Sequence, residues 1–227
     1  VIEHMQSLGV DTIEFMPLMT WADERHLAVL NLSNGWGYNP YCFGAPDPRL
    51  VPGGWEEVRS TFAKLHEAGF QLVLDVVYNH TGESDFGGPT LSLRGLDNST
   101  YYRMVAGQLV NDTGCGNTLA TEHPAVMAMV LQSQRLWVAA GIDGFRYDLA
   151  TVLGRNSHGF NIDTPLMRAI RDDAVIGRTL HIAEPWDIGP GGYQLGEFPG
   201  WMEWNDKYRD GVRHFWRGDG WVGEFAT

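Results

Sequence analysis

The stretch "QLVLDVVYNH", residues 71–80, decides the fold class of this chain. It is an almost continuous apolar run, interrupted by Asp75 and closed by Asn79 and His80. A run of this kind is typical of a strand in a parallel sheet that is covered on both faces. The stretch therefore predicts an α/β protein.

Strand-like and helix-like segments alternate on both sides of this run. Four more strands are expected, at 11–18, 141–150, 179–187 and about 200–204, and helices at 53–69, 123–141, 163–177 and about 205–218. This order predicts parallel strands joined by crossover helices. Two long connections, at about 19–54 and 79–121, follow strands. They are therefore expected at the carboxyl ends of the sheet, where α/β proteins keep their sites.

The composition limits the class of partner. The chain has 227 residues, of which 44% are hydrophobic, and its formal net charge is -12. Nucleic acids and anionic membranes favour basic surfaces, so neither is expected as a partner, whereas a neutral sugar is compatible. Cys42 and Cys115 favour free thiols in a reducing compartment, and hence a cytoplasmic location; a disulfide is the alternative.

Charged and polar side chains cluster where three successive strands end. Asp75, Asn79 and His80 lie in the first of these strands, Arg146 and Asp148 in the second, and Glu184 in the third, with Asp187 close behind. A single charge at a strand end is equally well explained as a solvated or helix-capping group. The coincidence on three strands predicts a site at one rim of the sheet.

The types of charge in this set indicate a reaction class. Two carboxylates across a cleft are what glycoside hydrolysis needs, one as acid and one as nucleophile or base. Arg146 and Asp148 are two residues apart and share a strand face, and the arginine keeps the aspartate ionised, as a nucleophile requires. Glu184, on the neighbouring strand, could keep a raised pKa and serve as the acid.

Aromatic residues give a second indication of a sugar ligand. Phe, Trp and Tyr make up 12% of the chain, and Trp36, Tyr38 and Tyr41 lie among Gly, Asn and Pro in a long connection. Sugar rings pack their C–H faces on aromatic planes. Core packing is the alternative for each aromatic residue, but it is less plausible in such a loop.

Three of the strand-end segments resemble those of a known family. "DVVYNH" (75–80), "GFRYD" (144–148) and "AEPWD" (183–187) resemble three of the four signature segments of the alpha-amylase superfamily of glycoside hydrolases. Longer stretches, at 35–49, 111–119, 189–210 and 212–219, resemble the isoamylase-type glycogen debranching enzymes. The resemblance implies a (β/α)₈ TIM barrel. Residues 1–227 would form one partial catalytic domain that supplies about strands two to six.

The resemblance also implies a role for each candidate catalytic residue. In a retaining mechanism, Asp148 would be the nucleophile and Glu184 the general acid/base. Arg146 would hydrogen-bond to the nucleophile and orient it. No cofactor is implied.

Four further residues are implied to bind the substrate. Asp75 and His80 would belong to the sugar-binding and supporting shell, and Tyr38 would stack on the glucose whose bond is cut. Trp186 would line the leaving-group side. His80 and Asp75 could also be considered a metal pair, but the sequence has no zinc-type ligand spacing and no EF-hand loop, so no metal is expected.

One signature segment departs from the family pattern. The family has a His-Asp pair at a later strand, but His214 and Asp219 are neither adjacent nor in a strand-like run. The third carboxylate is therefore expected beyond Thr227. The opening residues, 1–10, resemble the tail of a helix, so we expect an internal piece of a longer protein. Because an open barrel leaves unpaired edges, the isolated chain is expected to fold poorly and to be inactive.

The favoured function is hydrolysis of α-1,6-glucosidic branch linkages in glycogen or limit dextrins. A hydrolase of α-1,4 linkages or a transglycosylase would use the same carboxylates. A non-catalytic glucan-binding protein on a decayed barrel and a purely structural fragment are the alternatives outside the enzyme class. Intact Asp148, Glu184 and Arg146 argue against a decayed site.

Overall fold

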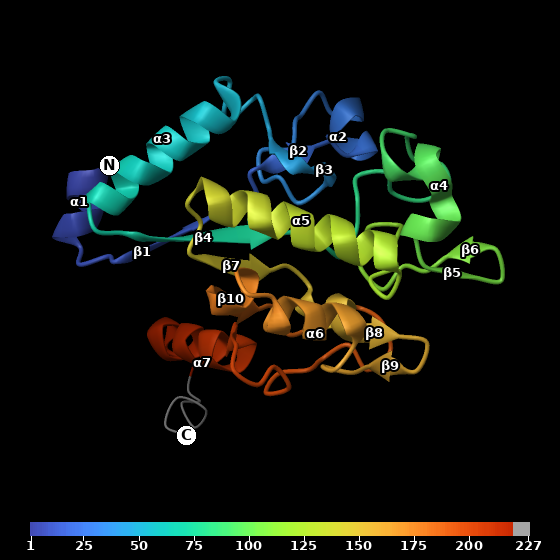
Figure 1. Cartoon of the computed structure of the whole chain (residues 1–227). Helices are drawn as coiled ribbons and strands as arrows, with labels where there is room; N and C mark the ends of the chain where they lie inside the picture. Colours follow the sequence, from blue (N-terminus) through green and yellow to red (C-terminus); the bar gives the residue numbers. More distant parts are fainter. Residues whose placement is uncertain (220–227) are drawn as a thin grey trace.

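A five-stranded parallel sheet forms the framework of the computed structural model, which describes residues 1–219 (Figure 1). Its spatial order is β1 (Thr12–Phe15), β4 (Gln71–Val76), β7 (Gly144–Tyr147), β10 (Leu180–Ala183) and β11 (Met202–Glu203). Each strand pairs in parallel with the next. All five lie within the segments predicted to be strands, so the prediction of an α/β protein with a parallel sheet is confirmed.

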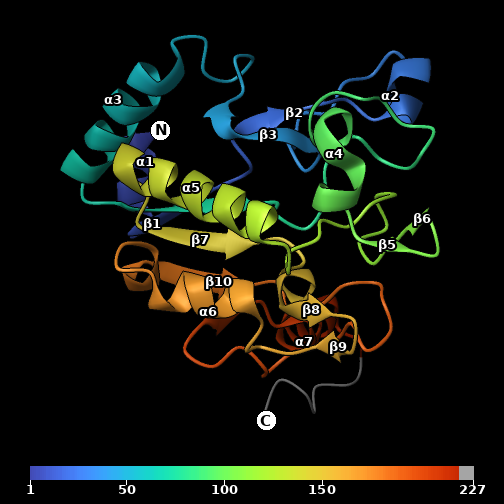
Figure 2. The same ribbon diagram turned by 45° about the vertical axis from the view of Figure 1, so that its right-hand side comes forward.

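Helices precede, connect and follow the strands of the sheet. They are α1 (Ile2–Ser7), which precedes β1, then α3 (Gly54–Glu67), α5 (Pro124–Ala140), α6 (Pro165–Asp172) and, after β11, α7 (Asp206–Arg217). Figures 1 and 2 show α5 and α6 side by side in front of β7 and β10. α3 packs against β4 and against α5, which in turn contacts α6, so these three helices form one layer.

The buried centre of this layer explains why the helices form where they do. Trp137 on α5 is fully buried, and its ring lies 4.7 Å from that of Trp55 on α3. Gly141 ends α5 in a left-handed conformation with φ 118, and a Cβ atom there would lie 3.3 Å from Phe62. The glycine therefore both ends the helix and lets it approach α3 closely.

The predicted helix at 163–177 is shorter than expected. α6 ends at Asp172, and a 3-10 turn, η2 (Ile176–Arg178), follows it. The Asp173 carboxylate accepts hydrogen bonds from the backbone N–H groups of Val175 and Ile176, each at 2.9 Å. This side chain offers the backbone an alternative to helical hydrogen bonds, and the chain turns toward β10.

The two long connections carry small elements of their own. The first contains β2 (Met19–Trp21), α2 (Arg25–Val29) and β3 (Pro40–Pro46), with β2 and β3 antiparallel. The second contains α4 (Leu93–Tyr101) and a hairpin of β5 (Met104–Val105) and β6 (Gln108–Leu109). The connection after β7 contains the 3-10 turn η1 (Ala150–Gly154) and a hairpin of β8 (Arg155–Asn156) and β9 (Gly159–Phe160). All lie on the side of the molecule toward which the arrow of β4 points (Figure 1).

A buried carboxylate shapes the second long connection. Glu83 is 0% exposed and accepts hydrogen bonds from the backbone N–H groups of Leu91, Ser92 and Arg94 at 2.7–2.9 Å. Its other partner is the hydroxyl of Tyr102, which donates to it. A buried charge with four donors is well compensated, so this loop has a defined conformation rather than an open one.

Two further findings concern the described residues as a whole. No helix within residues 1–219 combines the length and the apolar character needed to cross a membrane. Cys42 and Cys115 are free thiols, as the sequence favoured.

Candidate active site

A cleft of about 780 Å³ opens at the carboxyl ends of the parallel strands. Six of the seven predicted site residues line it, together with residues from β1 and the long connections. The lining residues are Glu14, Met16, Trp36, Tyr38, Asp75, His80, Cys115, Arg146, Asp148, Leu149, Glu184 and Trp204. The strand ends thus bring the predicted charges together at one rim.

Arg146 lies at the centre of the charged network in this cleft. Its side chain is 2% exposed, and its Nη1 lies 2.9 and 2.8 Å from the two oxygens of Asp75 and 3.2 Å from Oδ1 of Asp148. Its Nη2 lies 2.9 Å from Oε2 of Glu184. The sheet register produces this contact set, because Arg146 on β7 pairs with Asp75 on β4 and with Ile182 on β10. One buried cation therefore holds three carboxylates from three adjacent strands.

Asp148 is held from a second side by Asn79. The Asn79 amide Nδ2 donates to both the carboxylate Oδ2 and the backbone carbonyl of Asp148, each at 2.8 Å. Asn79 is 0% exposed. Sequence reasoning noted Asn79 at the strand end but did not include it among the site residues. The two donors, Arg146 and Asn79, fix the plane of the Asp148 carboxylate.

His80 supports Asn79 from behind. One ring nitrogen faces Oδ1 of Asn79, and the other lies 2.9 Å from the backbone carbonyl of Tyr38. Burial lowers the pKa of His80, and the nearby Asp148 carboxylate opposes that shift. His80 thus links the backbone of the Tyr38 loop to the side chain that orients Asp148.

Glu184 lies at the end of β10 in a different electrostatic environment. Its Oε2 forms an ion pair with Nη2 of Arg146 and accepts a hydrogen bond from the backbone N–H of Leu149 at 2.8 Å. Burial and, to a smaller extent, the Asp148 carboxylate raise the pKa of Glu184 to about 7, although Arg146 opposes both. A carboxyl group with this pKa can donate a proton near neutral pH.

The contact between Leu149 and Glu184 requires an unusual backbone conformation. Leu149 has φ 43 and ψ 53, in the left-handed region that residues other than glycine seldom adopt. This conformation directs its N–H toward Glu184, and residues in such conformations cluster at functional sites. Because the contact uses a backbone group, the sequence contains no side-chain signal for it.

Asp75 is the most enclosed of the three carboxylates. It is 1% exposed, accepts from Arg146, and accepts the hydroxyl proton of Tyr38. Burial raises its pKa to about 7, although Arg146 opposes that shift. Both of its oxygens accept hydrogen bonds, so Asp75 supports Arg146 and Tyr38 at the base of the cleft.

Aromatic side chains frame the mouth of the cleft. Trp36, which is 71% exposed, and Tyr38 both line it. Between them, Gly37 has φ 83, and a Cβ atom there would lie 2.7 Å from the carbonyl oxygen of Pro17. The turn that presents the two rings therefore requires a glycine. Tyr41, the third aromatic of this loop, lies instead in an outer groove with Leu93 and Met129.

Trp186 is the predicted site residue that does not line the cleft. It lies in a neighbouring hollow of about 400 Å³ together with Trp204 and Asn205. Trp204, which sequence reasoning missed, lines both spaces, and the guanidinium carbon of Arg146 lies 3.8 Å from the centre of its ring. Its position directly after β11 is the same signal that identified the other strand-end residues. Asn205 caps α7 by accepting from the Tyr208 N–H at 2.9 Å, as expected for a helix start.

No metal-binding arrangement is found in the described part of the chain. Across residues 1–219, no group of three or more His, Cys, Asp or Glu side chains is placed to hold a metal ion. The position of the family's third carboxylate was expected beyond residue 227, which lies outside the described residues.

Comparison with known proteins identifies relatives of the chain. No family model matches it. It is 47% identical over 237 residues to a glycogen debranching enzyme of Serratia proteamaculans, and 48% identical over 235 residues to one of Yersinia enterocolitica. Each alignment covers 100% of this chain and 35% of the relative, so the chain spans about a third of their length.

Solved structures agree with this similarity. A pullulanase from Paenibacillus barengoltzii, in complex with maltohexaose and alpha-cyclodextrin, superposes with a TM-score of 0.73 at 27% identity. The match covers 93% of this chain and 34% of the pullulanase. The resemblance to glycogen debranching enzymes that the sequence predicts is therefore confirmed.

Proposed function

We propose that this chain, a relative of the glycogen debranching enzymes, forms part of the catalytic domain of a retaining glycoside hydrolase. Its substrate would be a branched α-glucan, such as glycogen or a limit dextrin, and the bond cut would be the α-1,6 linkage at a branch point. The observation that carries the proposal is the shared contact of Asp148 and Glu184 with the buried Arg146 at the base of one cleft. The names of the relatives support the choice of linkage.

The different surroundings of Asp148 and Glu184 support different roles for the two carboxyl groups. In the first step, the Asp148 carboxylate attacks the anomeric carbon while Glu184 gives its proton to the glycosidic oxygen. The bond between the anomeric carbon and the glycosidic oxygen breaks. The product of this step is a glycosyl ester of Asp148. In the second step, ionised Glu184 takes a proton from a water molecule, whose oxygen attacks the anomeric carbon and releases Asp148.

The other residues around the cleft orient these two carboxyl groups or contact the sugar. Arg146 and Asn79 hold the Asp148 carboxylate in a fixed orientation, and Arg146 also neutralises the charge that remains when Glu184 loses its proton. Tyr38 and Trp36 offer flat apolar surfaces to the sugar at the mouth. In its neighbouring hollow, Trp186 would contact the glucan on the leaving-group side.

We further propose that the five parallel strands are about strands two to six of a (β/α)₈ barrel. The open edges of β1 and β11 would pair with further strands, one of which would carry the third carboxylate. The chain alone would then lack part of the active site. A cytoplasmic location, free of nucleic-acid and membrane partners, is supported by the two free thiols and the net charge of -12.

The test uses the chain extended at both ends to the length of its relatives. Release of reducing ends is compared between branched limit dextrin and linear amylose, with Asp148→Asn as the inactive control. Cleavage of the branched substrate alone, abolished by the substitution, is the expected result. Cleavage of amylose would instead assign the protein to α-1,4 hydrolysis or transglycosylation, and binding without cleavage would indicate a glucan-binding protein.

A further inference from the structure

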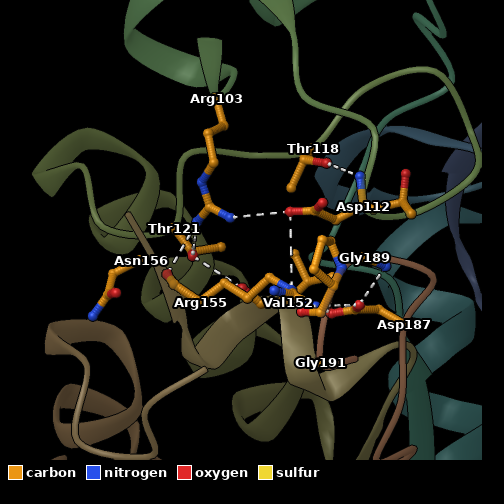
Figure 3. A network of polar contacts seen from close by, with 12 residues as sticks. Arg103, Asp112, Thr118, Thr121, Val152, Arg155, Asn156, Asp187, Gly189 and Gly191 are labelled. Atoms are coloured by element: carbon orange, nitrogen blue, oxygen red, sulfur yellow. Dashed lines mark hydrogen bonds and ion pairs between the residues drawn. The ribbon is translucent and has the colours of Figure 1, made fainter. Parts of the chain in front are cut away.

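A second cluster of charges, outside the cleft lining, joins three loops (Figure 3). It contains two arginines and two aspartates, Arg103, Asp112, Arg155 and Asp187, none of which lines the cleft. Arg103 and Asp112 belong to the connection after β4, Arg155 to the segment after β7, and Asp187 to the segment after β10. These are the strands that carry Asp75, Asp148 and Glu184.

The central pair of the cluster is Arg155 and Asp187. Nε and Nη2 of Arg155 each lie 2.6 Å from a different oxygen of Asp187, so the ion pair is bidentate. The side chains are 5% and 0% exposed, respectively. A buried pair of this kind adds little net stability over apolar side chains of similar size, but its geometry is highly specific. Its main effect is therefore to fix the relative position of the two segments.

The same pair also organises the loop after β10. Asp187 Oδ1 accepts from the backbone N–H of Gly189 at 2.8 Å, and Arg155 Nη2 donates to the carbonyl of Pro190 at 3.0 Å. A Cβ atom on Gly192 would lie 2.3 Å from Asp187 Oδ1, so the loop closes tightly around this carboxylate. Arg155 thus contacts both a side chain and the backbone of this loop.

The connection after β4 holds the pair from the other side. Asp112 lies 3.9 Å from Nε of Arg155 and 3.7 Å from Nη1 of Arg103, and its backbone carbonyl accepts from the Ile188 N–H at 3.0 Å. Arg103 donates in turn to the backbone carbonyl of Arg155 at 3.1 Å. All three loops therefore share one set of polar contacts (Figure 3).

The position of the cluster in the chain connects it to the two carboxyl groups of the proposed reaction. Arg155 follows Asp148 through the short turn η1, and Asp187 follows Glu184 after Pro185 and Trp186. The intervening segments are already tied together at the cleft, because the backbone N–H of Ala150 donates to the carbonyl of Glu184 at 2.9 Å. Arg155 and Asp187 form a second tie between the same two segments.

We propose that Arg155 and Asp187 are positioning residues, and that their ion pair sets the separation and relative orientation of Asp148 and Glu184. This inference rests on the proposed function, because it assigns the pair a role in that reaction. Neither residue lines the cleft, so the effect is transmitted through the two segments. A displacement of about 1 Å between reacting groups can slow an enzyme about a hundredfold, so a small shift is sufficient.

The test compares Arg155→Lys and Asp187→Asn with the wild type in the protein extended to the length of its relatives. Lysine keeps the positive charge but cannot form the bidentate contact. Asparagine keeps the shape of the side chain and an oxygen that accepts from the Gly189 N–H. Each is expected to lower kcat on branched limit dextrin at least about tenfold while KM changes much less. If the two segments loosen, water reaches Glu184 and the Asp148 carboxylate moves away from it. Both changes lower the pKa of Glu184, so the alkaline limb of kcat/KM should move to lower pH.

Arg135→Lys is the matched control. Arg135 on α5 makes two contacts with one carboxylate oxygen of Asp173, in an ion pair away from the cleft. Its replacement should leave kcat and the pH profile unchanged. If Arg155→Lys and Asp187→Asn behave like this control, the inference is wrong. It is equally wrong if kcat falls only in proportion to lost thermal stability while the pH profile stays fixed. An inactive wild type would refute the proposed function instead.

Discussion

Asn79 shows how much a single amide can contribute to the orientation of Asp148, the proposed nucleophile. It gives both of its N–H bonds to Asp148 and has no solvent exposure, so water cannot replace it. Arg146 binds the other carboxylate oxygen, and the loss of Asn79 would leave that group free to rotate. The effect should appear in the chemical step rather than in substrate binding.

We therefore expect Asn79→Ala to lower kcat about 10- to 100-fold while KM changes little. Steady-state kinetics on limit dextrin measure both constants. Asn205→Ala is the control, because it removes the cap of α7 and costs about 1 kcal/mol of stability without contact to Asp148. A kcat for Asn79→Ala equal to that of the control would contradict the role of Asn79.

The raised pKa of Glu184 gives a pH dependence with a definite sign. The group must be protonated to act as the acid, and its pKa lies at about 7 because of burial and the Asp148 carboxylate. Activity should therefore be retained below pH 7 and fall as the pH rises through that value. The alkaline limb of kcat/KM in the free enzyme measures this.

A variant separates the two causes of the shift. In Asp148→Asn the neighbouring negative charge is removed and the burial remains, so the pKa of Glu184 should fall but stay above its ordinary value of 4.5. Because this variant is expected to be inactive, the titration is followed by NMR of the labelled carboxyl carbon. An unchanged pKa would show that Asp148 does not contribute.

At the scale of the elements, the hydrophobic pattern predicted the strands and helices, but it did not predict the loops whose conformation depends on contacts between distant residues. The strand segments were identified because near-continuous apolar runs reflect local burial, and the strand-end rule then placed Asp75, Arg146, Asp148 and Glu184 together. Trp186 was expected among them, yet its loop is folded by Asp187 and Arg155, which are far apart in sequence and have no periodic signal. The likeness to a known family supplied the assignment of roles, which spacing alone left open.

The loop that presents Trp36 and Tyr38 offers a test at this scale. Gly37→Ala places a Cβ atom in a left-handed backbone and within 2.7 Å of the Pro17 carbonyl, so the turn must change. We expect a cost of about 1 kcal/mol or more in stability and a severalfold rise in KM for limit dextrin, with a smaller change in kcat. The two rings belong to the altered loop and should move most, whereas Asp148 and Glu184 keep their contacts with Arg146, which lies outside this loop.

Gly35→Ala in the same loop is the control. Gly35 has no left-handed backbone, and a Cβ atom there would have nothing within 4 Å. Its KM and melting temperature should match the wild type. Equal KM values for Gly35→Ala and Gly37→Ala would mean that the two rings do not contribute to substrate binding.

At the scale of the whole molecule, the sheet is open at both sides. Among the described residues, β1 pairs with β4 alone and β11 with β10 alone, so each has one edge without a partner strand. Apolar side chains at these edge strands are exposed, including Met16 at 46% and Met202 at 60%. An exposed strand edge beside apolar surface is a template for pairing with another chain.

We therefore expect the 227-residue chain alone to self-associate and to cleave no limit dextrin, whereas extension at both ends should give a stable, active protein. Sedimentation velocity over a tenfold range of concentration measures the first property, and reducing-end release the second. The two readouts separate the causes, because open edges predict self-association, whereas the proposed third carboxylate on a further strand predicts inactivity. A monomeric chain that cleaves limit dextrin would show that the described strands and their cleft are sufficient, and that the barrel needs no further strands for the reaction.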